Sequence, residues 1–131
     1  MRSPAVAAFL PFVLPLLLAV PALGQRPKTA EEAVARLQKL ADKPESERFR
    51  AVGDVGDFAD DSATQKLLGE LQGAQSLAYR QAVIRALGEH RRPAAVPALG
   101  QELADARSVR LLETVAQALA KQGDDGVSLL A

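Results

Sequence analysis

The sequence offers few side chains that could carry out catalysis. It contains no cysteine and only one histidine, His90, among 131 residues. A histidine metal site needs two or three ligands, and a nucleophilic triad needs a serine beside the histidine in space. His90 lies in segment 89–93, which is typical of a turn between two helices. We therefore interpret His90 as a helix C-terminal residue favoured by the helix dipole, and we expect no enzymatic activity and no cofactor.

Four aspartates close together form an acidic cluster, which comprises Asp54, Asp57, Asp60 and Asp61. Calcium binds several oxygen atoms arranged on a tight loop. The spacing of these aspartates differs from that of a calcium loop, because the required glycine and the closing glutamate are absent. We interpret Asp60 and Asp61 as helix N-caps instead, and we predict no metal site.

Arg91 and Arg92 follow Arg85 at a distance of one to two helical turns. Guanidinium groups held in place suit phosphate or carboxylate, so these arginines could form a small anion site. The alternative is a solvated turn that completes the C-terminus of a helix, and we favour this second interpretation.

The elements that would position these side chains are helices. Apolar residues recur at helical spacing in seven segments, and the connections between segments are only a few residues long. Thr29 followed by Glu32 has the form of a capping box, and Gly73 is typical of a helix stop. The expected starts are Thr29, Pro44 with Ser46, Asp61 or Ser62, Ser76, Pro93, Ser108, and Asp124 with Asp125.

Three of these segments recur at one constant interval, and they are 51–56, 83–88 and 115–120. We call this interval one repeat. The apolar positions of the three segments agree, and the last position holds a small residue in every copy: Gly56, Gly88 and Ala120. A small residue there allows a neighbouring helix to approach closely. The sequence therefore predicts an internal helical repeat.

The central copy resembles a known family. Residues 79–88 (Tyr-Arg-x-x-Val-Ile-x-Ala-Leu-Gly) and 93–99 (Pro-Ala-Ala-Val-Pro-Ala-Leu) resemble the HEAT-like repeat named after phycobilisome lyases. Segment 104–110 (Ala-Asp-Ala-Arg-Ser-Val-Arg) is similar to that family's inter-repeat Asp followed by Val-Arg. The resemblance covers most of residues 44–131 and is weaker outside the central copy, where Arg80 is matched by Arg48 but by Leu112 in the last copy.

The resemblance implies an α-solenoid. We expect an all-α fold over residues 29–131: a short α-solenoid of antiparallel helical hairpins, with about three repeats. Short connections force neighbouring helices to run antiparallel. The segment after the last repeat is apolar, and we expect Val127, Leu129 and Leu130 to be partly exposed or covered by a partner.

The first 24 residues are typical of a secretory signal peptide, with a positive start, an apolar stretch and small residues before a cut at Gln25. Residues 25–28 then form a short polar linker. The prediction is a periplasmic or secreted protein. The alternative is an uncleaved segment, residues 5–24, that anchors the protein in the membrane, because the uncharged stretch is long enough to span a bilayer.

Charge composition bears on the kind of partner. Removal of residues 1–24 leaves 15 basic against 16 acidic residues, which gives no field to attract a nucleic acid. We expect a protein or peptide partner, and a membrane contact only if the signal segment is retained.

The repeat register predicts where such a partner binds. Positions four apart on the second helix of each hairpin lie on one face, and stacked copies of that face form a ladder of mixed charge. The expected partner-binding residues are Phe49 and Asp57 in the first copy, Gln81, Arg85 and Glu89 in the second, and Glu113, Gln117 and Lys121 in the third. Gly53 completes the first row.

These observations predict an exported, non-catalytic protein-interaction module or scaffold. One alternative is a membrane-tethered scaffold that keeps its signal segment. Another is a lyase-like or accessory enzyme role, which the resemblance to the phycobilisome-lyase repeats implies but the secretion signal does not favour.

Overall fold

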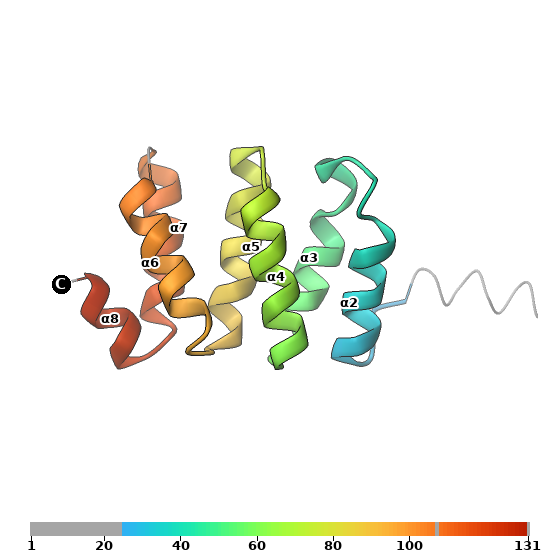
Figure 1. The fold of residues 1–131 in the computed structure, drawn as a ribbon, viewed down its shortest axis with the longest axis horizontal. Helices are drawn as coiled ribbons and strands as arrows, with labels where there is room; N and C mark the ends of the chain where they lie inside the picture. Colours follow the sequence, from blue (N-terminus) through green and yellow to red (C-terminus); the bar gives the residue numbers. More distant parts are fainter. Residues whose placement is uncertain (1–24, 107, 131) are drawn as a thin grey trace, which may run out of the picture.

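The computed structural model describes residues 25–106 and 108–130, and within them all regular structure is helical. The expected signal peptide lies outside the described residues. The elements are α2 (Ala30–Lys39), the 3-10 helix η1 (Glu45–Glu47), α3 (Phe49–Gly56), α4 (Asp61–Gly73), α5 (Leu77–His90), α6 (Ala95–Asp105), α7 (Val109–Ala120) and α8 (Asp124–Leu130) (Figure 1).

The helices stand in two rows (Figure 1). One row contains α2, α4, α6 and α8, and the other contains α3, α5 and α7, with each helix packed against its neighbours in both rows. The pairs α2/α3, α4/α5 and α6/α7 are hairpins of consecutive helices. The all-α prediction is confirmed, and the stacked hairpins are compatible with a short α-solenoid.

Three predicted helix starts are confirmed by side-chain caps. The hydroxyls of Thr29, Ser76 and Ser108 each accept a hydrogen bond from the backbone N–H three residues later, at 3.1 Å. These bonds satisfy N–H groups that the first turn of a helix leaves without a partner. Asp124 and Asp125 open α8, and α4 ends at Gly73, both as predicted.

Asp60 is confirmed as a helix N-cap, because its carboxylate accepts a 2.8 Å bond from the Ala63 N–H, whereas Asp61 and Ser62 lie inside the first turn of α4. One predicted start is wrong in detail. Pro93 lies in a turn before α6 rather than in its first helical turn.

Segment 44–48 is a further correction. Pro44 and Ser46 do not start an α-helix: Pro44 precedes a single 3-10 turn, and α3 begins only at Phe49. The physical reason is a tertiary contact, because the Glu45 carboxylate accepts hydrogen bonds from the backbone N–H groups of Gln75 (2.7 Å) and Ser76 (3.0 Å). These bonds hold the turn against the entry to α5.

The core lies between the two rows. Its largest fully buried apolar side chains come from both rows, and they include Leu37, Leu67, Tyr79, Ile84, Leu87, Leu99 and Leu119. Each helix contributes one apolar stripe, so burial depends on neighbouring hairpins rather than on any hairpin alone. In the part of the chain that the structure describes, none of the helices has the length and apolar character needed to cross a bilayer.

Candidate functional site

The repeat register is built into the backbone of α3, α5 and α7. A Cβ atom added to Gly56 would lie 2.9 Å from the Cβ of Ala86, and one added to Gly88 would lie 3.0 Å from the Cβ of Ala118. Both contacts therefore pair a glycine with an alanine of the next helix in the row. Ala120 is the third member of this series and lies exposed at the end of α7. Close approach of the helices in this row is what aligns the predicted ladder.

Seven of the eight predicted partner-binding residues are exposed on this row of helices. They are Phe49, Asp57, Arg85, Glu89, Glu113, Gln117 and Lys121, and together with Gly53 they form what we call the α3–α5–α7 surface.

Gln81 is the exception, and its predicted exposure is wrong. Gln81 is only 7% exposed, and its side-chain N–H donates to the Thr114 hydroxyl at 3.3 Å. The position of Gln81 faces the next helix of the row, so its amide bridges α5 and α7. Gln81 therefore helps to hold α5 against α7 and is not part of the exposed surface.

A shallow hollow of about 270 Å³ lies between α3 and α5 on this surface. Small residues contribute to its lining, because Gly53, Gly56, Ala82 and Ala86 leave room beside the two helices. The larger lining residues are Phe49, Asp57, Arg85 and Glu89. One aromatic ring, one cation and two anions thus meet around a space large enough for a side chain of a partner.

Phe49 is held in place by the core. Its ring meets Tyr79 edge to face, with ring centroids 5.5 Å apart and planes at 89°. Edge-to-face pairs of this kind are favourable beyond the area they bury. Phe49 nevertheless remains 37% exposed, so it presents a fixed apolar face to solvent.

Charges on the other side of the surface pair with each other. The Lys121 ammonium donates to the Glu89 carboxylate across the step from α7 to α5. This hydrogen bond is the main cause of the lowered pKa of Glu89. Both side chains are well exposed, so the pair contributes little to stability and remains available to a partner.

His90 is the last residue of α5, as predicted, and it is also buried, which the sequence did not predict. It ends α5 and is only 3% exposed. Its Nε2 lies 2.9 Å from the Val55 carbonyl oxygen, and its Nδ1 lies 2.8 Å from the Thr64 hydroxyl. A carbonyl only accepts, so Nε2 carries a proton, and in the neutral ring Nδ1 accepts from the Thr64 hydroxyl. Both ring nitrogens are occupied, which leaves neither for a substrate or a metal.

The three arginines of the possible anion site have different positions and different contacts. Arg92 pairs with Asp61 at 2.9 Å and also donates to the Ala59 carbonyl. Arg91 caps α5 in the left-handed conformation with φ of 51°, and Arg85 lies at the hollow. The alternative interpretation, a turn that completes a helix C-terminus, agrees with these positions.

Two of the four clustered aspartates, Asp60 and Asp61, take part in local structure. Asp60 caps α4, which lowers its pKa chiefly through the hydrogen bond from the Ala63 N–H. Asp61 pairs with Arg92. Among the described residues, no group of three or more potential ligands could hold a metal ion.

Sequence reasoning missed two partly buried ion pairs that follow the repeat spacing. Arg48 pairs with Glu70 at 3.0 Å, and Arg80 pairs with Glu102 at 2.5 Å. Each pair joins the second helix of one hairpin to the first helix of the next. The signal was present, because both the arginine and the glutamate recur one repeat later.

A second concave region, also unpredicted, separates α4 from α6. It has a volume of about 550 Å³ and is lined by Gln65, Leu68, Leu71, Gln72, Arg80, Ala94, Pro97, Ala98, Gln101 and Glu102. The first helices of successive hairpins are therefore less tightly packed than the second helices.

Comparisons with known proteins add no further assignment, because no family model, no curated protein and no solved structure matches this chain.

Proposed function

We propose that this protein is an exported, non-catalytic interaction module built on HEAT-like repeats, and that it binds a protein or peptide through the α3–α5–α7 surface. The observation that carries the proposal is the hollow between α3 and α5. It brings Phe49, Arg85, Asp57 and Glu89, all proposed from the repeat register, around one space.

The chemistry of this surface favours a polypeptide partner. Aromatic residues and arginine are enriched at the centres of protein interfaces, where they contribute much of the binding energy. Phe49 and Arg85 are residues of these types, and the neighbouring carboxylates of Asp57 and Glu89 add a site for a basic group. A nucleic acid would instead require a cluster of cations without interleaved anions.

The proposal of a non-catalytic role is supported by how the reactive side chains are used. The single histidine bridges α3 and α4 by two hydrogen bonds. Export is supported by the three-part pattern of residues 1–24.

A charge-reversal experiment tests the binding surface. The full chain is expressed with its own N-terminus, and its partner is captured from the envelope fraction and identified. The dissociation constant of that partner is then measured for the parent protein and for the double variant Arg85→Glu with Glu113→Arg. We expect the affinity for the partner to fall by about tenfold or more, because each reversal places a charge of this protein against a like charge of the partner.

The matched control is Lys39→Glu with Asp42→Arg, which reverses two exposed charges that lie outside α3, α5 and α7 and also preserves net charge. This control should leave the dissociation constant unchanged. Unchanged affinity in the Arg85/Glu113 variant would exclude the α3–α5–α7 surface as the binding site.

Processing is tested separately by N-terminal sequencing of the protein recovered from cells. A mature chain that begins at Gln25 supports export with cleavage. A chain that retains residues 1–24 supports the membrane-tethered scaffold instead.

A further inference from the structure

The turn between α5 and α6 holds one side chain in a backbone conformation that is unusual for its type. Arg91 directly follows the last residue of α5 and has a φ of 51°, which lies in the left-handed region. Among the described residues other than glycine, Arg91 is the one with a positive φ. In this region a Cβ atom lies too close to the following carbonyl oxygen, so the conformation costs free energy for a residue that carries one.

The equivalent position one repeat later is a glycine. Gly123 lies in the turn between α7 and α8 and has a φ of 84°. A Cβ atom at Gly123 would have no atom within 4 Å, so the backbone conformation, and not lack of space, makes glycine suitable there. The two turns therefore share a left-handed residue, and the turn after α5 carries an arginine where glycine would be unstrained.

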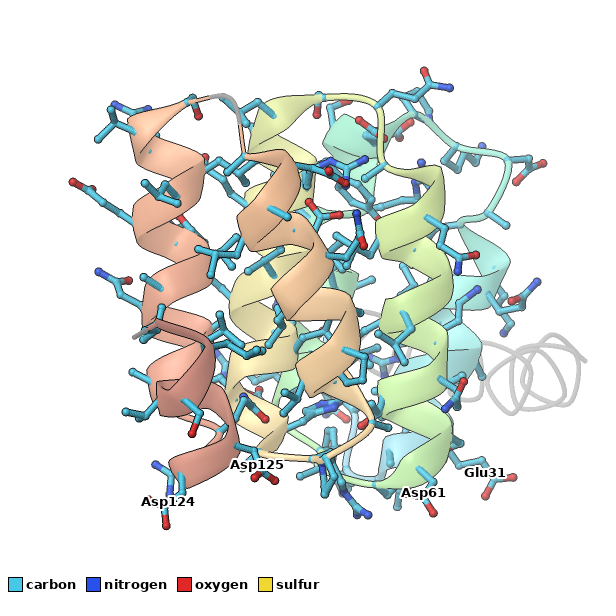
Figure 2. All side chains as sticks on the ribbon, turned by 60° about the vertical axis from the view of Figure 1, so that its left-hand side comes forward. Glu31, Asp61, Asp124 and Asp125 are labelled. Carbon is cyan, nitrogen blue, oxygen red and sulfur yellow. The ribbon has the colours of Figure 1, made fainter. Side chains whose placement is uncertain are left out.

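Contacts within the chain do not account for the arginine. Arg91 is exposed, and within the described residues its guanidinium forms no hydrogen bond or ion pair. Carboxylates are present at this lower end of the molecule, because Asp61 begins α4 and Asp124 and Asp125 begin α8 there (Figure 2). Asp61 pairs with Arg92, the next residue of the turn. The cost of the left-handed conformation is therefore not offset by a bond from the Arg91 side chain.

The charges around Glu89 leave Arg91 in excess. The hydrogen bond from Lys121 is the main cause of the lowered pKa of Glu89, and the nearby charge of Arg91 adds to it. Glu89 lines the hollow between α3 and α5 together with Asp57 and Arg85. The two carboxylates are balanced by Arg85 and Lys121, so Arg91 adds one positive charge to this end of the α3–α5–α7 surface.

We propose that Arg91 is a partner-binding residue of the α3–α5–α7 surface and that it binds a carboxylate of the polypeptide partner, from an aspartate or a glutamate. Residues held in costly backbone conformations are concentrated at functional sites such as ligand clamps. A guanidinium binds a carboxylate through two parallel hydrogen bonds. One surplus charge suits one carboxylate rather than the many phosphates of a nucleic acid. The inference rests on the proposed function, because it adds a residue and a partner group to the same surface.

A random peptide library tests the binding role. The full chain with its own N-terminus is immobilised, and phage-displayed peptides are selected on the parent protein and on Arg91→Gly. Peptides selected on the parent should be enriched in aspartate and glutamate, and this enrichment should be lost on Arg91→Gly. The dissociation constant of an acidic peptide selected on the parent should rise by about tenfold in the variant.

Three further variants separate the charge of Arg91 from its backbone conformation. Arg91→Ala removes the charge but keeps the Cβ atom, so it should weaken binding of the acidic peptide as much as Arg91→Gly does. Arg91→Lys keeps the charge without the paired donors, so it should retain part of the affinity. Lys39→Ala removes an exposed cation from α2 and should leave the dissociation constant unchanged.

Stability should change in the direction opposite to binding. In urea denaturation followed by circular dichroism, Arg91→Gly should raise the midpoint, because glycine adopts the left-handed conformation without a steric clash. Gly123→Ala should lower the midpoint for the converse reason. A midpoint for Arg91→Gly at or below that of the parent protein would mean that Arg91 is not strained, and it would overturn the proposal.

The binding results distinguish this inference from the proposed function. If the affinity for an acidic peptide falls in the double variant Arg85→Glu with Glu113→Arg but not in Arg91→Gly, the surface stands and the role of Arg91 is overturned. If the affinity falls in neither variant, the α3–α5–α7 surface is excluded as well. A selection on the parent that gives no acidic enrichment, or no binding peptide, would also overturn the role of Arg91.

Discussion

The two joints between hairpins share a plan but differ in chemistry. We define the first joint as the contact of α2/α3 with α4/α5, and the second joint as the contact of α4/α5 with α6/α7. Both contain a glycine packed on an alanine and an arginine paired with a glutamate, at equivalent positions one repeat apart. The backbone arrangement is therefore repeated between the two joints.

The first joint has more aromatic contacts than the second joint, and these are combined with partly buried polar contacts. Glu70 accepts hydrogen bonds from both Arg48 and the Tyr79 hydroxyl, and the Arg48 guanidinium lies 4.9 Å from the centre of the Tyr79 ring. In the second joint, Leu111 occupies the place of Tyr79, and Arg80 reaches the Ala74 carbonyl as well as Glu102. Phe49, which contacts Tyr79, is likewise replaced by Gln81.

The helix ends show the same relation. His90 and Gln122 are one repeat apart, and each donates a side-chain N–H to a carbonyl near the C-terminus of the preceding helix in the row. His90 is buried and is also hydrogen-bonded to the Thr64 hydroxyl, whereas Gln122 is only half-buried. The comparison teaches that a repeat can preserve the position of a hydrogen-bond donor while its chemical type and burial change.

The largest expected effect is common to both joints. Gly56→Leu and Gly88→Leu each force a side chain against the backbone of an alanine that lies 3.0 Å from the position of the new Cβ. Overpacking of this kind costs about 3 kcal/mol in the free energy of unfolding. Denaturation with urea, followed by circular dichroism, should show similar losses for the two variants.

Gly53→Leu is the control for these variants, because a Cβ at Gly53 has no atom within 4 Å. Because Gly53→Leu removes a glycine from a helix, it should leave the free energy of unfolding unchanged or raise it by up to about 1 kcal/mol. If Gly56→Leu is tolerated as well as Gly53→Leu, the close contact between α3 and α5 does not exist in solution.

The second prediction separates the joints. His90→Ala removes a buried ring and leaves the Thr64 hydroxyl and the Val55 carbonyl without that partner, so it should cost about 2–3 kcal/mol. Gln122→Ala removes a half-buried amide and should cost about 0.5–1 kcal/mol. His90→Gln should recover part of the loss, because Gln122 makes the equivalent bond in the second joint. Equal losses for His90→Ala and Gln122→Ala, measured by urea denaturation, would contradict the unequal burial of the two side chains.

The sequence alone predicted the helices and the repeat. Apolar periodicity located all the hairpins, because an amphipathic helix must bury one stripe. Caps at Thr29, Ser76 and Ser108 were predicted because the cap bond is local, with donor and acceptor three positions apart in the sequence. The start of α3 was not predicted, because Glu45 is held by Gln75 and Ser76, which are distant in the sequence.

The candidate surface was predicted from register, with one error. Period and spacing place Phe49, Gln81 and Glu113 at equivalent positions, but they do not give the burial of each one. Gln81 is covered because α7 supplies Thr114 as a partner, whereas Glu113 at the end of the row is exposed. The role of His90 also required the tertiary structure, since its two partners lie on α3 and α4.

The third prediction concerns the aromatic residue that distinguishes the first joint. Tyr79 is 1% exposed, and burial together with the hydrogen bond to Glu70 raises its pKa well above the ordinary value of 10.0. Above pH 10 the unfolded chain loses this proton while the folded chain keeps it, so alkali favours unfolding. The contribution is fully present below pH 10 and declines by about 1.4 kcal/mol per pH unit above it, until the folded pKa is reached.

Tyr79 is the only tyrosine and the chain has no tryptophan, so ultraviolet absorbance of tyrosinate reports this one group. Tyrosinate should appear together with the loss of helical circular dichroism as pH rises, rather than at the pH of a free tyrosine. Tyr79→Phe should cost about 1 kcal/mol at neutral pH and should show a shallower alkaline decline. Ionisation of Tyr79 near pH 10 in a protein that is still fully helical would mean that its ring is not enclosed by the first joint, and the contrast between the two joints would then rest on His90 alone.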